Sequence, residues 1–537
     1  MGLREHGDVL VTSWFLTKSE RGNPATAIDD RNPDGLAWTE GNRVRALVHG
    51  EIYFRELLTA IEGTDVGDVI MFTDWRGDPD EQLDGPGTEI AAVLAAAAKR
   101  GVVIKGLIWR SHHDSLQFSA GPNRELVDAI QAAGGDCLLD MRVRVGGSHH
   151  QKLFVVRHRA RPQSDVAFVG GIDVCHSRND SAEHLGDPQA VPMAQSYGER
   201  PPWHDVQLEI RGPAIGDVET VFRERWNDPA ELSSNLVHRL RDRLERRKAD
   251  PGELPRRLPD PPASVPLPGG MAGVPQHVQV LRTYPRLRTR PYPFAPRGER
   301  SIARGYLKAI RQARKLIYVE DQYLWSEEVI RPFAAALEAN PELRIIAVLP
   351  IFPDSANPAV ADAQAYGRHK ALSTLRRAGG DRVASYGIEN EAGTPIYVHA
   401  KVCVIDDTWA TVGSDNFNLR SWTYDSELTC AVFDPTGGDG LPRDLRLTLQ
   451  REHLSRADGD DEDLLDPAAT FAAFAACARD LEEWHAGGRT GPRPVGRLRT
   501  YQPPSVARWR RIPARMVYRA VCDPDGRPTK LRLRDRF

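Results

Sequence analysis

Hydrophobic and polar positions along the chain form two kinds of segment, and these segments alternate. At 53–63, YFRELLTAIEG places its apolar residues three or four positions apart, which predicts an amphipathic helix. The apolar run VIMFTD at 69–74 has the length and composition of a buried strand. A second such helix at 90–99 precedes a second apolar run at 102–109. Strands that alternate with helices are typical of α/β folds.

The same order of segments returns in the second half of the chain. An amphipathic stretch at 305–314 precedes the apolar run LIYVED at 316–321, and a further helix and strand follow at 328–350. Each half continues with three apolar runs, which are LFVV, VAFVGG and VQLEI in the first half and VCVI, WATVGS and ELTCAV in the second. A matched order over this length predicts an internal duplication.

The segments outside the repeat divide the chain further. Between the halves, 254–276 is rich in Pro and Gly and predicts a linker after a charged helix at 235–250. Beyond about residue 445 the repeat stops, and an acidic loop, a helix and an Arg-rich tail follow. We therefore expect four parts: an N-terminal lobe (1–230), a charged helix with a linker (231–275), a C-terminal lobe (276–445), and a C-terminal helix with a basic extension (446–537).

Composition narrows the class of protein. The formal net charge of −3 over 537 residues argues against nucleic acid as a partner. The six cysteines form no C-x-x-C pair, which argues against a zinc site or a disulfide framework. The N-terminal residues lack the apolar core of a signal peptide, and no run of about 18 apolar residues occurs. We expect a soluble cytoplasmic protein, with peripheral contact to a membrane as an open alternative.

The residues that can carry chemistry lie at the head of one strand in each half. HHQKLFVV and HAKVCVID both contain His-x-Lys before an apolar run, although only ten of the 71 basic residues are lysines. In a strand, residues i and i+2 share a face, so His150 projects with Lys152, and His399 projects with Lys401. Two homologous halves that pack about a pseudo-twofold axis can bring both pairs to one cleft.

Two imidazoles and two ammonium groups around one cleft suit a phosphodiester substrate. One histidine can attack phosphorus and form a covalent phospho-histidine, which divides one difficult step into two. The other can protonate the leaving alkoxide and then activate water, while the lysines stabilise charge on the non-bridging oxygens. Because cations and proton donors are already present, we expect neither a metal ion nor another cofactor.

Each of these histidines needs an acceptor for its second ring nitrogen, which fixes the tautomer. Asp205 in WHDVQL and Asp425 or Glu427 in YDSEL lie at matching ends of the two halves, and both stretches share Asp-x-Gln/Glu-Leu. Asp425 and Glu427 share one face of a strand, so the spacing leaves open which of them orients His399.

The two motifs resemble the duplicated signature of the phospholipase D superfamily, His-x-Lys-x4-Asp followed by Gly-Ser-x-Asn. The second copy is complete: His399, Lys401, Asp406, Gly413, Ser414 and Asn416. IYVEDQYL and PPWHDVQLEIRGPA are also similar to strands of that family, and the resemblance covers about residues 40–445. It implies two homologous lobes, each a mixed β-sheet flanked by helices, with the active site at the lobe interface. A monomer would suffice for such a site, and the oligomeric state stays open.

The resemblance also implies roles for individual residues. His150 would be the nucleophile and His399 the general acid, and Lys152, Lys401 and Asn416 would bind phosphate. Further residues of the two motifs would bind the phosphate or orient the histidines: Gly171, Asp173, Asp205, Ser414, Asp425 and Glu427.

The first copy departs from the signature at two positions. Arg157 stands where the motif has Asp, and Asp165 is a candidate substitute. The equivalent Asp406 belongs to the catalytic motif, but an offset of seven residues places it on the strand face opposite the histidine, so we expect a structural role. Asp173 in GGID replaces Asn416, and a carboxylate beside a phosphate is unfavourable unless it pairs with a cation.

GGID segments occur among phospholipase-like members of the superfamily, which favours a lipid substrate over nucleic acid. We expect a phospholipase D that hydrolyses a glycerophospholipid such as phosphatidylcholine, at a membrane surface, to phosphatidic acid and the headgroup alcohol. Transfer to an alcohol acceptor would be a second reaction of the same intermediate. Three alternatives remain open: a phosphatidyltransferase of the cardiolipin-synthase kind, a nucleic-acid phosphodiesterase, and a non-catalytic lipid-binding scaffold.

Overall fold

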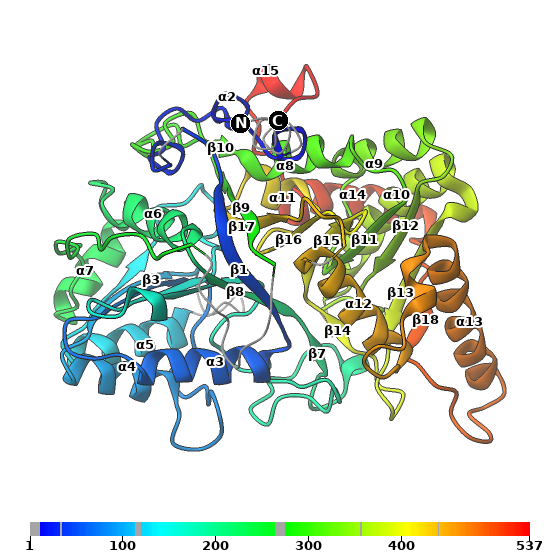
Figure 1. Ribbon diagram of the computed structural model, residues 1–537, viewed down its shortest axis with the longest axis horizontal. Helices are drawn as coiled ribbons and strands as arrows, with labels where there is room; N and C mark the ends of the chain where they lie inside the picture. Colours follow the sequence, from blue (N-terminus) through cyan, green and yellow to red (C-terminus); the bar gives the residue numbers. More distant parts are fainter. Residues whose placement is uncertain (1–10, 33–34, 113–119, 264–273, 355–356, 439) are drawn as a thin grey trace.

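The computed structural model describes residues 11–32, 35–112, 120–263, 274–354, 357–438 and 440–537. Within these ranges, a single sheet of 16 strands runs through the molecule, and helices lie on both of its faces (Figure 1). An additional two-stranded sheet joins β7 (Trp203–His204) to β14 (Tyr397–Val398).

The order of strands in the large sheet is the same when read outward from its centre in either direction. At the centre, β1 pairs antiparallel with β9, with Thr39 opposite Val278. Outward from β1, the first half contributes β1 (Thr39–Val48), β8 (Val206–Arg211), β6 (Val166–Gly170), β5 (Leu153–Arg157), β2 (Val69–Asp74), β3 (Val103–Trp109) and β4 (Asp136–Asp140). The second half contributes β9 (Gln276–Tyr284), β17 (Glu427–Phe433), β16 (Trp409–Gly413), β15 (Lys401–Ile405), β11 (Leu316–Asp321), β12 (Arg344–Val348) and β13 (Val383–Ile388).

This symmetry confirms the internal duplication and the two-lobed α/β fold. In each lobe three strands are parallel (β2–β3–β4 and β11–β12–β13), and the remaining pairs are antiparallel. The parallel strands are continuous apolar runs because helices cover both of their faces.

Two layers of helices cover the sheet, and each layer has its own core. On one face, α3 (Gly50–Glu62), α4 (Ile90–Lys99) and α5 (Ala120–Ala132) pack on the first lobe, and α8 (Ser301–Ile310), α9 (Glu327–Ala339) and α10 (Pro358–Gly379) pack on the second. On the other face, α6 (Ala214–Trp226) and α12 (Leu441–Leu454) share one apolar core with strands of both lobes. A continuous core on this face holds the two lobes together.

The segment after the repeat belongs to the second lobe. β18 (Leu498–Thr500) pairs with β13 at the edge of the large sheet, and α13 (Pro467–Ala486) contributes Phe474 to the core. α12 crosses the expected boundary at residue 445, because it is the counterpart of α6 and extends the repeat. The other domain boundaries stay predictions.

Shorter elements complete the fold. They are α2 (Lys18–Arg21), α7 (Leu236–Leu244), β10 (Glu299–Arg300), α11 (Leu419–Thr423), α14 (Arg511–Val517) and α15 (Thr529–Arg532), with short 3₁₀ and π turns between them. In the described part of the chain, no helix combines the length and apolar character needed to cross a bilayer.

Candidate active site

The backbone ties the head of each His-x-Lys strand to the opposite lobe. The amide of His150 donates to the carbonyl of Ser426 at 2.9 Å, and the amide of His399 donates to the carbonyl of His204 at 2.8 Å. The β7–β14 pair and a parallel bridge from His149 to Ser426 make the same two connections. The two motifs therefore meet at the lobe interface, as the sequence predicted.

The side chains cross the interface in the same way. His150 Nδ1 lies 2.8 Å from Oε2 of Glu427, and His399 Nδ1 lies 2.6 Å from Oδ2 of Asp205. While these carboxyl groups are ionised they only accept hydrogen bonds, so Nδ1 carries the proton in each ring and Nε2 keeps its lone pair. Each histidine is thus oriented by a carboxylate from the other lobe.

This pairing across the lobes, in which Asp205 binds His399 and Glu427 binds His150, corrects the expectation that Asp425 or Glu427 orients His399. The strand register also shows why the sequence misled: Gly170 lies opposite Gln207, whereas its counterpart Gly413 lies opposite Thr429. Asp205 is therefore the counterpart of Glu427, and the shared Asp-x-Gln/Glu-Leu pattern is offset by two residues.

Asp425 has a different task. One of its carboxylate oxygens accepts the Ser148 amide at 2.8 Å, and Arg420 donates to the other at 2.7 Å. These bonds fix the loop that precedes His150. Asp425 is therefore a structural neighbour of the site, and it makes no hydrogen bond to either histidine within the described residues.

The two lysines lie in equivalent positions. Lys152 Nζ donates to the carbonyl of His150 at 3.1 Å, and Lys401 Nζ donates to the carbonyl of His399. Lys401 also donates to Oε1 of Gln322 at 3.2 Å. Lys152 is among the charges that lower the pKa of Lys401, so the two ammonium groups lie near one another. Gln322 was not predicted from the sequence, although it lies in the segment IYVEDQYL directly after β11.

Asp173 has the cationic partner that its position requires. Its carboxylate lies 3.1 Å from Lys152 Nζ and 3.7 Å from a guanidinium nitrogen of Arg178. Burial and the neighbouring Asp173 together raise the pKa of Asp74 well above its ordinary value, so the two carboxyl groups share one proton. The negative charge at this position is thereby compensated.

Burial sets the protonation states of the site. It lowers the pKa of His399 to about 3 and holds the pKa of His150 well below its ordinary value, with help from the adjacent lysines. Burial also raises the pKa of Glu427 to about 7. It opposes ionisation of Asp205, but His399 and Lys401 outweigh it and bring that pKa to about 2. Two neutral imidazoles therefore lie beside two carboxylates of unequal acidity.

The small residues after β6 and β16 position these carboxylates. The Ser414 hydroxyl donates to Glu427 Oε2 at 2.5 Å and accepts the Leu428 amide at 3.0 Å. At the equivalent position, a Cβ on Gly171 would lie only 2.3 Å from Oδ1 of Asp205. Ser414 and Gly171 therefore act on the carboxylates that hold the histidines.

Asn416, two residues after Ser414 in the chain, has an unsatisfied acceptor. Its side-chain Oδ1 is buried and has no hydrogen-bond partner among the described residues. An amide in this condition is available to a ligand. Its assignment as a phosphate binder stays a prediction.

Aromatic rings lie against both histidines. Trp75, at the end of β2, meets the ring of His150 edge-on with 5.9 Å between centroids. Trp203 lies 4.9 Å from the ring of His399 and stacks on the guanidinium of Arg178 at 3.9 Å. The roles of Trp203 and Arg178 were not predicted from the sequence, because neither residue belongs to the repeated motif.

The motif aspartate lies at the other end of its strand. Asp406 accepts the amides of Arg314, Lys315 and Leu316 at 2.6–2.8 Å and so fixes the start of β11. Its expected structural role is confirmed, and its place among the catalytic residues is corrected. The physical reason is the odd offset of seven residues, which turns its side chain away from His399.

Arg157, the replacement in the first copy, makes buried ion pairs with Asp165 at 2.8 Å and with Glu219. Asp165 also accepts the His158 amide at 2.6 Å. Neither Arg157 nor Asp165 contacts the histidines or lysines of the site, so this departure leaves the site intact.

The fold and site define a duplicated α/β protein with one shared His/Lys centre. Residues 127–253 match the family model of phospholipase D, and residues 306–440 match that of the cardiolipin synthase, phospholipase D-like domain. Each match contains one His-x-Lys motif. The chain belongs to the phospholipase D superfamily and carries two of its domains.

Several characterised proteins are similar to this chain. Phospholipase D beta 2 of Arabidopsis thaliana is 26% identical over 412 residues, which cover 58% of this chain and 44% of that protein. Phospholipase D alpha 1 of Zea mays is 25% identical over 502 residues, which cover 70% and 59%. The chain spans about half the length of these relatives. The crystal structure of phosphatidylserine synthase from Haemophilus influenzae Rd KW20 covers 81% of this chain and 93% of its own, with 13% identity and a TM-score of 0.49.

Proposed function

We propose that this protein is a phospholipase D-type phosphodiesterase that acts on glycerophospholipids at a membrane surface. The observation that carries the proposal is the pairing across the lobes. Each histidine is held through Nδ1 by a carboxylate of the opposite lobe, and a lysine donates to the backbone carbonyl of each histidine. The matches to phospholipase D and its plant relatives support the lipid substrate.

The first chemical step joins the substrate to the protein. Nε2 of His150 attacks phosphorus, a P–N bond forms, and the bond from phosphorus to the headgroup oxygen breaks. His399, protonated beside the bound phosphate anion, gives its proton to the leaving alkoxide. Because the pKa of His399 is only about 3 in the free site, this histidine must take up its proton as the phosphate anion binds. The carboxylate of Asp205 at its Nδ1 then stabilises the imidazolium form.

The second step releases the product. Water gives a proton to His399 and attacks phosphorus, the P–N bond breaks, and phosphatidic acid leaves with His150 restored. A primary alcohol in place of water would yield a phosphatidyl-alcohol. Lys152, Lys401 and Asn416 would stabilise the non-bridging oxygens in both steps, and a single donor of this kind typically contributes about 10²- to 10³-fold in rate.

The proposed site needs neither a second subunit nor a metal ion in its chemistry. We also propose the cytoplasm as the location, with the phospholipid surface as the partner. The weak net charge, −3, speaks against a nucleic-acid substrate, and the intact histidines and lysines speak against a non-catalytic scaffold.

A product assay tests the function. Phosphatidylcholine vesicles are incubated with the protein, with and without a primary alcohol, and the wild type is compared with His399→Ala. Phosphatidic acid in water and phosphatidyl-alcohol with alcohol, both lost in the variant, are expected. No product from phosphatidylcholine or from other glycerophospholipids would refute the proposal.

A second candidate is a phosphatidyltransferase of the cardiolipin-synthase kind, which the family match at 306–440 favours. Vesicles that contain phosphatidylglycerol distinguish the two. A transferase would form cardiolipin as the main product, whereas the hydrolase would release phosphatidic acid.

A further inference from the structure

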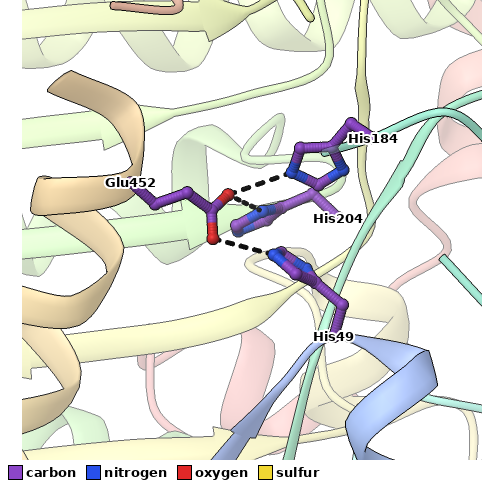
Figure 2. A group of neighbouring side chains, drawn as sticks. All are labelled: His49, His184, His204 and Glu452. Carbon is purple, nitrogen blue, oxygen red and sulfur yellow. Dashed lines mark hydrogen bonds and ion pairs between the residues drawn. The ribbon is translucent and has the colours of Figure 1, made fainter. Parts of the chain in front are cut away.

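A second group of buried histidines lies next to the residue that holds His399, and its side chains converge on one carboxylate (Figure 2). We call it the histidine cluster, and its members are His49, His184, His204 and Glu452. The three histidines are at most 2% exposed. They come from the end of β1, from a loop and from β7, and Glu452 comes from α12.

The distances in the cluster are short. Glu452 Oε2 lies 2.8 Å from Nε2 of His49, and Oε1 lies 3.0 Å from Nε2 of His184 and 3.5 Å from Nδ1 of His204 (Figure 2). One ligand atom from each residue can be chosen so that all four lie within 4.8 Å of one another. A tetrahedral Zn²⁺ ion holds nitrogen and oxygen ligands at about 2.0–2.2 Å. Small movements of these side chains would therefore form such a site.

The tautomer of His184 points a lone pair into the cluster. Its Nδ1 lies 3.0 Å from the carbonyl of Trp203, which can only accept, so this nitrogen carries the proton. In a neutral ring, Nε2 then directs a lone pair at a carboxylate oxygen. That arrangement is unfavourable unless a positive charge lies between the two atoms.

His204 has the same arrangement with a carboxylate behind it. Its Nε2 lies 2.5 Å from Oε2 of Glu320, which also binds His453 at 2.7 Å and the Tyr318 hydroxyl at 2.5 Å. Its Nδ1 faces Glu452 and has no hydrogen-bond partner among the described residues. Outer acceptors that fix the tautomer of a histidine are characteristic of metal sites.

The fixed charges around the histidine cluster are negative overall, so a bound cation would balance them. Glu320 is fully buried and Glu452 is partly buried, with 12% of its side chain exposed. Asp180 lies 3.6 Å from His184, and Arg497 lies 3.7 Å from Glu452. Three carboxylates and one guanidinium leave two negative charges, which either two protons on the imidazoles or one divalent cation would balance. Three imidazoles with one carboxylate are a ligand set of the kind that zinc prefers.

We propose that the histidine cluster binds one divalent transition-metal ion, with Zn²⁺ as the best match. Four protein ligands would close the coordination sphere, so the ion is structural and takes no part in the phosphoryl chemistry. It would join α12 to the end of β1 and to β7. The carbonyl of His204 accepts the amide of His399, and the next residue, Asp205, binds the ring of His399. The ion would therefore also stabilise the position of His399.

The test uses the full chain, purified without a histidine tag from a medium that contains zinc. Metal content is measured by mass spectrometry after gel filtration, and the metal is then exchanged for Co²⁺. About one zinc per chain and the visible absorption of tetrahedral Co²⁺ are expected. If the wild type contains no zinc above background and shows no Co²⁺ absorption, the proposal is wrong. Protonated imidazoles would then balance the negative charge of the cluster.

Two variants assign the ion to the cluster. Glu452→Gln keeps the shape of the side chain but removes the charge, and it should abolish the Co²⁺ absorption. His485→Gln is the matched control, because His485 makes a comparable pair with Glu389 at 2.9 Å outside the cluster, and it should leave the absorption unchanged. If Glu452→Gln does not fold, X-ray absorption of the wild-type Co²⁺ protein decides. Fewer than three imidazole ligands, or an unchanged spectrum in a folded Glu452→Gln, would contradict the assignment.

Discussion

Glu427 of the second lobe holds the ring of His150 from the first lobe, with 2.8 Å between Oε2 and Nδ1. The reciprocal bond from His399 to Asp205 makes the site a product of both lobes. Neither lobe contains a correctly oriented histidine without the other. A duplicated chain keeps both halves permanently together, which a site of this kind requires.

Glu427→Gln should lower the rate of phospho-histidine formation strongly. An amide can offer its NH₂ group to Nδ1, which moves the ring proton to Nε2 and blocks the nucleophile. The analogous change in a Ser-His-Asp triad lowers kcat by about 10⁴-fold, and we expect about 10³- to 10⁴-fold here. Single-turnover formation of the phosphatidyl-histidine intermediate measures the effect.

Asp425→Asn provides the matched comparison. Asp425 binds a backbone amide and Arg420 but neither histidine, so its loss should lower the melting temperature more than the chemical rate. Equal losses of single-turnover rate in the two variants would contradict the assignment of Glu427 as the orienting carboxylate.

The rate should fall on both sides of neutral pH. Burial raises the pKa of Glu427 to about 7, so below this pH its protonated carboxyl donates to Nδ1 and the lone pair of Nε2 is lost. Burial lowers the pKa of Lys401 to about 8, so above this pH one positive charge is lost from the phosphate site. A pH profile of kcat/KM in wild type and Lys401→Arg measures both limbs. Retention of the alkaline limb in the arginine variant would exclude Lys401 as its source.

Gly171→Ala should impair protonation of the leaving group. The added methyl group would lie 2.3 Å from Asp205 Oδ1, so this carboxylate and the ring of His399 must shift. A misplacement of a catalytic group by about 1 Å can lower the rate about 10²-fold. The loss should be large for phosphatidylcholine and small for a p-nitrophenyl ester, whose leaving group needs no proton.

Gly121→Ala is the control for this substitution, because among the described residues the one side-chain atom near its Cβ is the distal guanidinium nitrogen of Arg124, at 3.9 Å. It should leave the rates with both substrates unchanged. An equal loss for both leaving groups in Gly171→Ala would argue against an effect through His399.

Arg157→Ala should destabilise the fold and leave the chemistry unchanged. Arg157 is 1% exposed and pairs with Asp165 and Glu219, and the loss of one partner from a buried pair costs about 3–5 kcal/mol. Urea denaturation measures the change, with exposed Arg159→Ala as the control. A normal kcat for the folded fraction is expected, and a large drop in that kcat would show that the first motif needs this position.

The sequence predicted the fold because its signals are local and occur twice. Alternation of helices and strands depends on the period of apolar residues, and the two halves repeat the same order. The shared face of His150 and Lys152 follows from the geometry of a single strand. For the same reason, the structural role of Asp406 could be predicted from an odd offset within one strand.

Only the tertiary structure decided which groups act together across the lobes. His399 and Asp205 are 194 residues apart, and His150 and Glu427 are 277 apart, so no local period relates them. The register of β8 and β17 against their neighbours makes Asp205 the counterpart of Glu427, although the sequence pattern aligned it with Asp425. The histidine cluster was not foreseen for the same reason: its members are scattered along the chain, and packing of α12 against the first lobe brings them together. Local chemistry thus determined the two motifs, and the packing of the lobes determined how they are completed.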